Sequence, residues 1–253
     1  MNKTILLGDT HGTSLWKLAT FQEDLYKSDR VIFIGDYFDS FDKELTAAIQ
    51  IQNFLDIVYY KKYCEEHNGP EVILLIGNHD HHYFPEVGYT GTSGFQHGMS
   101  AFITQAIQDN REHLKMAFQF DEFLCTHAGV SEVFMDGVFG KTGWSISNIA
   151  DNLNELFKHK PDAFLFDSRD WSGNGDDIIQ SPIWIRPRSL MKAGKMDREL
   201  KKHVIQIVGH THQDQIDIKG KATGGRYYFI DTLPASGEYL VIEDGVVKTG
   251  NTR

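Results

Sequence analysis

Short apolar runs recur along the chain, and each ends abruptly at a small residue followed by a polar side chain. The runs are Ile5–Leu7, Val31–Ile34, Val72–Ile76, Phe123–Cys125 and Val204–Val208. Near-continuous apolar segments rich in Val and Ile predict strands that are buried on both faces. Open α/β sheets bind ligands just beyond the carboxyl ends of such strands. The pattern therefore predicts one convergent site at the edge of a sheet.

Between these runs the apolar residues take up helical spacing. Helices are expected over residues 14–27, 44–66, 97–113 and 147–159. The second segment shows the i, i+3, i+4, i+7 spacing of an amphipathic helix at Ile51, Phe54, Leu55 and Val58. Asn68-Gly69-Pro70 then gives a strong stop signal.

The pattern changes after Thr211 to alternating strands. Residues 226–231 and 239–242 predict two strands, and an Asp244-Gly245 turn followed by residues 246–248 predicts a closing hairpin. The preceding segment 167–194 is rich in Asp, Ser, Gly, Trp and Arg. We expect it to form a functional loop or lid, because long loops are uncommon in compact domains unless they have a role.

Composition limits the class of protein. The 253 residues carry 25 basic and 35 acidic side chains, a formal net charge of −10. This charge argues against binding long nucleic acid, although metal ions could still make a phosphate-bearing substrate acceptable. Cys64 and Cys125 cannot form a disulfide framework, and no apolar run is long enough for a signal segment or a membrane span. A cytoplasmic protein without a membrane partner is expected.

The polar residues after the strands are donors that divalent metals accept. They are Asp9, His11, Asp36, Asn78, His127, His210 and His212. Carboxylate, imidazole and amide ligands indicate a site for manganese, iron or zinc rather than a structural zinc site, which would have thiolate ligands. Seven ligands exceed what one ion with open positions uses, so two ions that share a bridging carboxylate are the simplest interpretation.

Five motifs, in this order, resemble those of the calcineurin-like metallophosphoesterases. They are Gly8-Asp9-Thr10-His11-Gly12, Gly35-Asp36-Tyr37-Phe38-Asp39, Gly77-Asn78-His79-Asp80, His127-Ala128-Gly129 and Gly209-His210-Thr211-His212. The resemblance runs from residue 7 to about residue 212. It is closest to the branch of serine/threonine phosphoprotein phosphatases and diadenosine tetraphosphatases, on the segments 126–131, 181–187 and 229–232.

This resemblance implies an α/β fold, a four-layer αββα sandwich with two mixed sheets, in one domain over residues 1–253. It implies that Asp9 and His11 bind a first metal ion and that Asp36 bridges both ions. Asn78, His127 and His210 would complete the second ion, and His212 would be a further ligand of the first. Manganese is favoured, with iron, zinc or nickel as alternatives.

The resemblance also implies a catalytic pair. His79 would not bind metal but would donate a proton to the leaving oxygen, and Asp39 would hold its imidazole. A metal-bridging hydroxide would attack the phosphorus directly, so no phosphoenzyme is expected. His81 and His82 match no family position and are expected at the surface or behind the ligands.

Two positions depart from the family branch. Ser40 stands where the branch usually has a phosphate-binding Arg, so Arg186 is the first candidate for that role, followed by Arg188 and Arg169, with Asn78 as an amide contact. His212 stands where the branch usually has Pro, as in the wider family of phosphodiesterases and nucleases. Segments 81–100 and 167–196 are expected to determine the substrate.

The leading prediction is metal-dependent hydrolysis of a phosphomonoester, on a phosphoprotein or a small phosphorylated metabolite. The alternative enzyme is a phosphodiesterase or phosphoanhydride hydrolase acting on dinucleoside polyphosphates, cyclic nucleotides or nucleic-acid ends. A metal-binding scaffold of the same fold is the non-enzymatic alternative, which the complete ligand set and His79 make less favourable.

Overall fold

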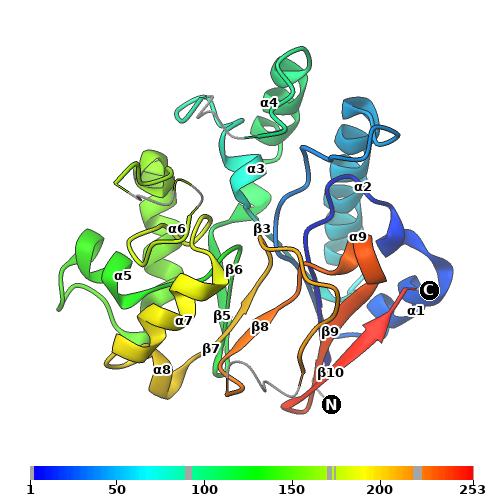
Figure 1. Cartoon of the computed structure of the whole chain (residues 1–253). Coiled ribbons are helices and arrows are strands. Elements are labelled where there is room, and N and C mark those ends of the chain that lie inside the picture. Colours follow the sequence, from blue (N-terminus) through cyan, green and yellow to red (C-terminus); the bar gives the residue numbers. More distant parts are fainter. Residues whose placement is uncertain (1–2, 89–92, 170–172, 174, 219–223, 253) are drawn as a thin grey trace.

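Two β-sheets pack face to face, with helices outside them (Figure 1). The computed structural model describes residues 3–88, 93–169, 173, 175–218 and 224–252. The first sheet has the order β10-β9-β1-β2-β3-β4 and the second β5-β6-β7-β8. Their bounds are β1 Lys3–Leu7, β2 Arg30–Phe33, β3 Glu71–Leu75, β4 Leu114–Lys115, β5 Ala117–Phe120, β6 Phe123–Thr126, β7 Ile205–Val208, β8 Tyr227–Phe229, β9 Glu238–Glu243 and β10 Val246–Asn251. Both sheets mix parallel and antiparallel pairs, which confirms the predicted fold class.

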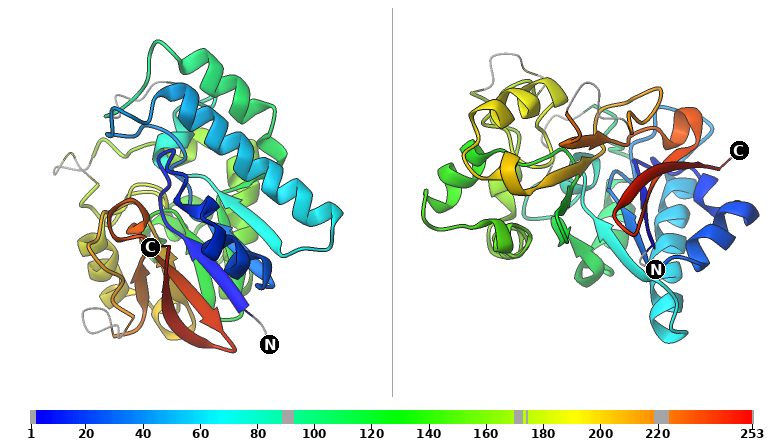
Figure 2. Two further views of the ribbon diagram at one scale, coloured as in Figure 1. Left: turned by 90° about the vertical axis from the view of Figure 1, so that its right-hand side faces the viewer. Right: turned by 90° about the horizontal axis from the view of Figure 1, so that it is seen from below.

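Helices cover the outer face of each sheet (Figure 2). On the first sheet they are α1 (Ala19–Tyr26) and α2 (Ala47–Glu66), with α4 (Ser100–Gln108) packed on α2. On the second sheet they are α5 (Glu132–Phe139), α6 (Ile149–His159), α7 (Pro187–Met196) and α8 (Leu200–His203). Short helices α3 (Asn78–His81) and α9 (Leu233–Ser236) follow β3 and β8 along the chain.

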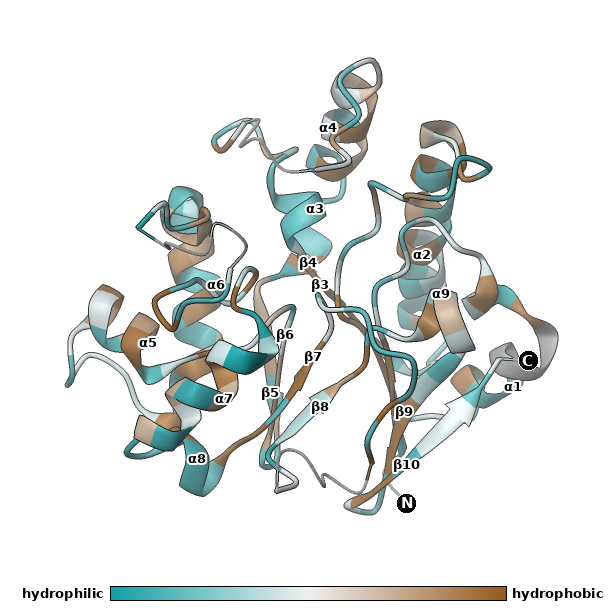
Figure 3. Cartoon of the chain, in the orientation of Figure 1, coloured by the Kyte–Doolittle hydropathy of each residue, from teal (hydrophilic) through white to brown (hydrophobic). Residues whose placement is uncertain are grey.

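The inner strands are buried on both faces, as their apolar runs predict. In β1, Ile5 and Leu7 belong to a buried cluster that includes Phe54 of α2, whereas Leu6 belongs to a second cluster with Cys125 of the opposite sheet. Successive side chains of a strand point to opposite faces, so one apolar run supplies both the helix layer and the space between the sheets. Hydropathy changes at the end of β3: in Figure 3 this strand is brown (hydrophobic), and α3, which follows it, is teal (hydrophilic).

Some predicted elements have different bounds. The helix expected over 14–27 is interrupted at Leu18, whose ψ of 136° is extended, so a 3-10 turn precedes α1. The prediction of a loop over 167–194 is wrong for its last part, because α7 begins at Pro187. Proline is preorganised for the first position of a helix, and Leu190 and Ala193 then bury one side of α7. The C-terminal hairpin is confirmed, with Asp244 at a φ of 49°.

Parts of the two segments expected to determine the substrate, residues 89–92, 170–172 and 174, lie outside the described residues. Among the described helices, none combines the length and the apolar character that a bilayer span requires.

A buried carboxylate links α5 to the start of α8, two of the helices that cover the second sheet. Glu132, at the start of α5, accepts hydrogen bonds from the backbone N–H groups of Glu199 (2.5 Å) and Leu200 (2.9 Å) and from Nε of Arg198 (2.8 Å). Burial alone would raise the pKa of Glu132, but these donors outweigh it and lower the pKa from 4.5 to about 2. The ionised carboxylate therefore stabilises the fold.

Replacing this carboxylate should cost stability in a pH-dependent way. We expect Glu132→Gln to lower the free energy of unfolding by about 2 kcal/mol near neutral pH. The folded pKa lies below the unfolded pKa, so the stabilisation is complete above pH 4.5 and is lost as the pH falls towards 2. Urea unfolding across this pH range measures the difference. Glu155→Gln, on the exposed face of α6, is the control, and an equal pH trend in both variants would contradict the assignment.

Candidate metal centre

Polar residues that follow six strand ends gather around one cavity of about 890 Å³. Residues after five of these strands line it, whereas His127, after β6, is fully buried and contacts the lining residues Asp36 and Asn78. The sequence predicted five of these strand ends, and the sixth is the end of β8, which Asp231 follows. The predicted site residues that line the cavity are His11, Asp36, Asn78, His79, Arg186, His210 and His212. Thus the parallel strands of both sheets deliver their polar ends to the same place.

Asp36 lies at the middle of this arrangement. Its Oδ2 lies 3.3 Å from Nε2 of His127 and 3.8 Å from Nε2 of His11. Its Oδ1 accepts a hydrogen bond from the backbone N–H of His79 at 2.9 Å. One carboxylate oxygen therefore faces imidazoles from two different sheets, as a bridging ligand would.

Asn78 forms a second point of convergence. Its side-chain Oδ1 lies 3.0 Å from Nε2 of His127 and 2.8 Å from Nδ1 of His210. All three residues are buried, and they follow three different strands, β3, β6 and β7. The amide oxygen and the two ring nitrogens surround one small volume.

The three convergent imidazoles are each held by a backbone carbonyl. The pairs are His11 Nδ1 with Phe38 O (2.6 Å), His127 Nδ1 with Ile34 O (3.0 Å) and His210 Nε2 with Trp184 O (3.1 Å). A ring nitrogen that faces a carbonyl carries the proton, which leaves a lone pair on the other nitrogen. In each case that other nitrogen is the one near Asp36 or Asn78. Metal-ligating histidines are typically oriented in this way.

Carboxylates outnumber cationic side chains in the cavity lining, where Asp36, Asp42 and Asp231 lie with Arg186. Both oxygens of Asp9 accept the backbone N–H of His210, at 3.1 and 3.0 Å. Burial, followed by the nearby carboxylates of Asp231 and Asp36, raises the pKa of Asp9 well above its usual value. Ligand atoms of Asp9, Asp36 and His127 lie within 4.8 Å of one another. The donor set and its excess negative charge fit divalent metal ions.

The turns that carry these ligands are tight. His11, Asp36, Asp39 and His210 all have left-handed φ values, of 43°, 53°, 62° and 66°. Such values are uncommon outside glycine and gather at functional sites. Two glycines allow the turns to meet: a Cβ on Gly77 would lie 2.0 Å from Oδ1 of Asp36, and a Cβ on Gly209 would lie 2.0 Å from Oδ1 of Asp9.

Asp80, a residue without a predicted role, holds the loop after β2. Its buried carboxylate accepts the backbone N–H groups of Asp36 and Tyr37, both at 2.8 Å, and of Gly77 at 2.9 Å. The bond to Gly77 is the one that an acidic residue makes near the start of a helix. An acidic residue three positions after a strand-end glycine was the available signal. Asp231 was also missed as a site residue, although its segment was part of the resemblance.

His79 and Asp39 form a pair at the cavity wall. Nδ1 of His79 lies 3.1 Å from Oδ2 of Asp39, and the ring of His79 lines the cavity. Burial would lower the pKa of His79, but the carboxylates of Asp36 and Asp39 outweigh it and raise the pKa. His82 also contacts Asp39, and both His81 and His82 are buried. Of the two expected placements, at the surface or behind the ligands, the surface is therefore wrong.

The other predicted residues are divided between cavity and surface. Half-buried Arg186 lines the cavity, where its Nη1 donates to the carbonyl of His210 (3.2 Å) and to Oγ1 of Thr211 (3.0 Å). His212 lies on the cavity wall with an exposed side chain. The structure does not bring Arg188 or Arg169 to the cavity. Both side chains are exposed, and they face Asp176 and Asp167, respectively.

Comparison with known proteins places the chain in a family. It belongs to the calcineurin-like phosphoesterases, whose family model matches residues 3–214. Family membership and the convergent ligand groups identify a metal-dependent phosphoesterase, a hydrolase. No match to a curated protein was found.

Solved structures share the fold at low sequence identity. A cold-active protein tyrosine phosphatase has a TM-score of 0.68 and 17% identity, with 100% of this chain and 77% of that chain covered. The cold-active protein-tyrosine phosphatase of the psychrophile Shewanella sp. has a TM-score of 0.63 and 18% identity, covering 100% and 78%. A protein serine/threonine phosphatase from Saccharomyces cerevisiae has a TM-score of 0.55 and 13% identity, covering 98% and 79%.

Methyl groups on the two close-approach glycines should weaken metal binding. We expect Gly77→Ala or Gly209→Ala to lower the affinity for Mn²⁺ by about 10-fold or more, because each Cβ displaces a proposed ligand carboxylate. Titration calorimetry measures the affinity, and circular dichroism checks the fold. Gly137→Ala is the control, since its Cβ meets nothing within 4 Å. Unchanged affinity in the first two variants would refute the ligand geometry.

Proposed function

We propose that the protein hydrolyses phosphomonoesters with the help of two divalent metal ions. The observation that carries this proposal is the convergence of three carbonyl-anchored imidazoles on Asp36 and Asn78, beside the His79–Asp39 pair. A metal-binding scaffold would need the ligands but not the pair. A paired imidazole on the cavity wall therefore favours turnover over mere metal binding.

Asp9 and His11 would hold one ion, with His212 as a further ligand, and Asn78, His127 and His210 would hold the other. Asp36 would contact both, because its Oδ2 lies between His11 and His127. When bound, such ions neutralise phosphoryl charge and activate a water molecule for attack. Carboxylate, imidazole and amide donors favour manganese, with iron, zinc or nickel as alternatives.

Arg186 is proposed to bind the phosphoryl oxygens. Its guanidinium lines the cavity and is held at the carbonyl of His210 and at Thr211 through Nη1. A planar guanidinium can still donate through its other N–H groups to a tetrahedral anion. Arg186 would thus take the role of the phosphate-binding Arg that the family branch usually has at the position of Ser40. The amide of Asn78 is a second candidate contact.

His79 is proposed to protonate the leaving oxygen. With Nδ1 turned to Asp39, Nε2 is the ring nitrogen left to give a proton. Direct attack by water fits the described site better than a covalent intermediate, because Cys125 is fully buried and burial raises the pKa of its thiol.

The rim of the cavity supports an aromatic group next to the phosphate. Phe41 is 74% exposed, and its ring centroid lies 6.5 Å from that of His79. Phe166 and Trp184 line another part of the same cavity. An exposed aromatic side chain in a cavity wall favours stacking on a ring. Two of the proteins that share the fold are protein tyrosine phosphatases, which supports the same substrate class, an aryl phosphomonoester such as phosphotyrosine.

A substrate panel with added Mn²⁺ tests the proposal. It compares para-nitrophenyl phosphate, its bis ester, phosphotyrosine and phosphoserine peptides, a dinucleoside polyphosphate and a single-stranded oligonucleotide. We expect the monoesters to give the highest kcat/KM, with phosphotyrosine above phosphoserine, because one Arg and an aromatic rim suit an aryl phosphate. Preference for the bis ester, the polyphosphate or the oligonucleotide would overturn the monoesterase assignment.

A pair of arginine variants tests phosphate binding. We expect Arg186→Gln to raise KM roughly 10- to 100-fold, which corresponds to the loss of a charge-assisted hydrogen bond. Arg188→Gln should change KM little, because the Arg188 side chain is 89% exposed and does not line the cavity. Steady-state kinetics on para-nitrophenyl phosphate measures the KM of both variants and of the wild type. A larger effect at Arg188 would reverse the assignment.

A further inference from the structure

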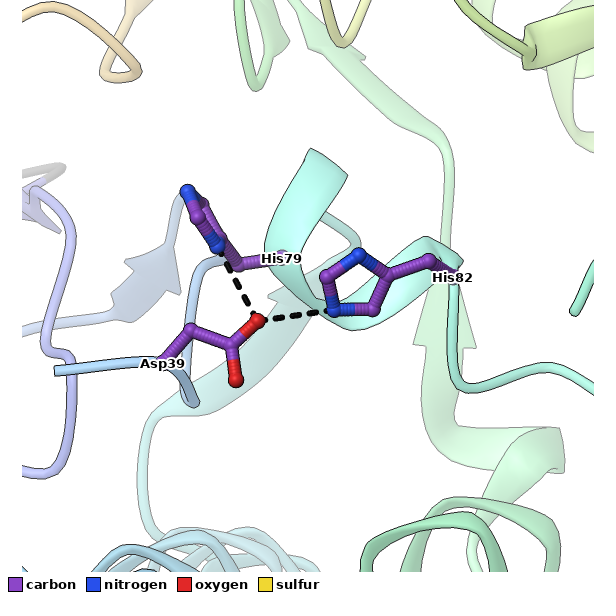
Figure 4. Close-up of side chains that lie close together, drawn as sticks. All are labelled: Asp39, His79 and His82. Atoms are coloured by element: carbon purple, nitrogen blue, oxygen red, sulfur yellow. Dashed lines mark hydrogen bonds and ion pairs between the residues drawn. The ribbon is translucent and has the colours of Figure 1, made fainter. Parts of the chain in front are cut away.

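Asp39 is contacted by four side chains at once. Its Oδ2 lies 3.1 Å from Nδ1 of His79 and 2.7 Å from Nε2 of His82 (Figure 4). Its Oδ1 accepts from the hydroxyl of Tyr83 at 2.6 Å and from Nε2 of Gln96 at 3.1 Å. Only His79 of these four side chains lines the cavity. The other three therefore act on Asp39 rather than on anything bound in the cavity.

The contacts of His82 and Tyr83 with Asp39 are buried, and Tyr83 is itself held in place. The side chains of Asp39 and His82 are 0% and 1% exposed. Tyr83 stacks on Phe95 at 4.7 Å, and its hydroxyl accepts the backbone N–H of Gln96 at 2.9 Å. Tyr83 donates an aligned hydrogen bond to this buried carboxylate, and such bonds are stronger away from water. His82 makes a close nitrogen–oxygen contact that is not aligned as a hydrogen bond, since neither of its ring nitrogens has a hydrogen-bond partner. The carboxylate has little freedom to turn away from His79.

We infer that His82 is a positioning residue for the reaction: together with Tyr83 and Gln96 it fixes the Asp39 carboxylate, which in turn fixes the ring of His79. This inference rests on the proposed function, in which His79 protonates the leaving oxygen. Productive proton transfer needs the donor within hydrogen-bond reach of the leaving oxygen, so a misplaced ring costs rate even when it carries the proton.

A metal ion held by Asp39, His79 and His82 is the competing explanation, because their ligand atoms lie within 4.8 Å of one another. The distances favour direct contact. Tetrahedral ligands about 2.0–2.1 Å from zinc would be separated by roughly 3.3 Å. Nε2 of His82 and Oδ2 of Asp39 are only 2.7 Å apart, and Oδ1 already serves Tyr83 and Gln96.

The choice of leaving group can distinguish a misplaced His79 ring from a general structural defect. An acidic phenol such as para-nitrophenol departs without a proton, whereas phenol depends on one. Weakening the hold on Asp39 should therefore slow phenyl phosphate hydrolysis much more than para-nitrophenyl phosphate hydrolysis. A merely structural defect would lower both rates equally.

The test compares His82→Phe, which keeps a ring of similar size but removes the nitrogen, with His82→Gln, whose amide can restore a donor. Tyr83→Phe removes only a hydroxyl. We expect His82→Phe and Tyr83→Phe to lower kcat on phenyl phosphate about 10- to 100-fold with little change in KM, and on para-nitrophenyl phosphate by less than about 3-fold. His82→Gln should recover most of the loss. His79→Asn gives the full leaving-group effect for reference.

His81→Phe is the matched control, since His81 is equally buried but contacts the carbonyl of Pro161 instead of Asp39. Metal content and thermal midpoint are measured for every variant. Equal losses on both esters, the same selectivity in His81→Phe, or the loss of a bound ion in His82→Gln would each overturn the inference. If His82→Phe does not fold, Tyr83→Phe decides alone. A wild-type protein inactive on both esters would instead reject the proposed function itself.

Discussion

The need to keep several carboxylates close together, away from water, governs this structure. Asp9, Asp36 and Asp231 lie in one buried cluster, and mutual repulsion raises the pKa of Asp9 together with burial. A protein tolerates such a cluster when cations compensate it. The left-handed turns at Asp36 and His210, and the close-approach glycines beside them, are the backbone conformations that would let these carboxylates share the proposed divalent ions.

The site is also where the two sheets are joined. His127 follows a strand of the second sheet, yet its Nδ1 faces the carbonyl of Ile34 beyond a strand of the first. The backbone N–H of His210, from the second sheet, binds Asp9 of the first. Each of these contacts orients a proposed ligand and at the same time ties one layer to the other. Precision at the metal centre and cohesion of the sandwich therefore have the same physical origin.

What could be predicted from sequence depended on whether a residue's partners are local. Buried strands followed by Asp, Asn or His could be recognised, because the apolar runs and their ends are local patterns and parallel strands bring such ends together. The beginning of α7 differs from the predicted loop although Pro187 marks it, because the polar composition of the segment favours a loop. The roles of Asp80 and His82 could not be found in this way, since their partners, Asp36 and Asp39, lie more than 40 positions away and only tertiary packing brings them together. The sequence already ranks Arg186 before Arg188, and the start of α7 places Arg186 at the cavity and leaves Arg188 exposed.

The joining of the sheets through His210 has a consequence for synthesis. Asp9, Asp36 and Asn78 leave the ribosome early, but they meet their last partner only when β7 and the turn after it have docked. A nascent chain that ends before residue 210 lacks the imidazole that faces Asn78 and the N–H that binds Asp9. The proposed centre therefore becomes complete only after the turn that follows β7 has been made, and shorter translation products carry the early motifs without it.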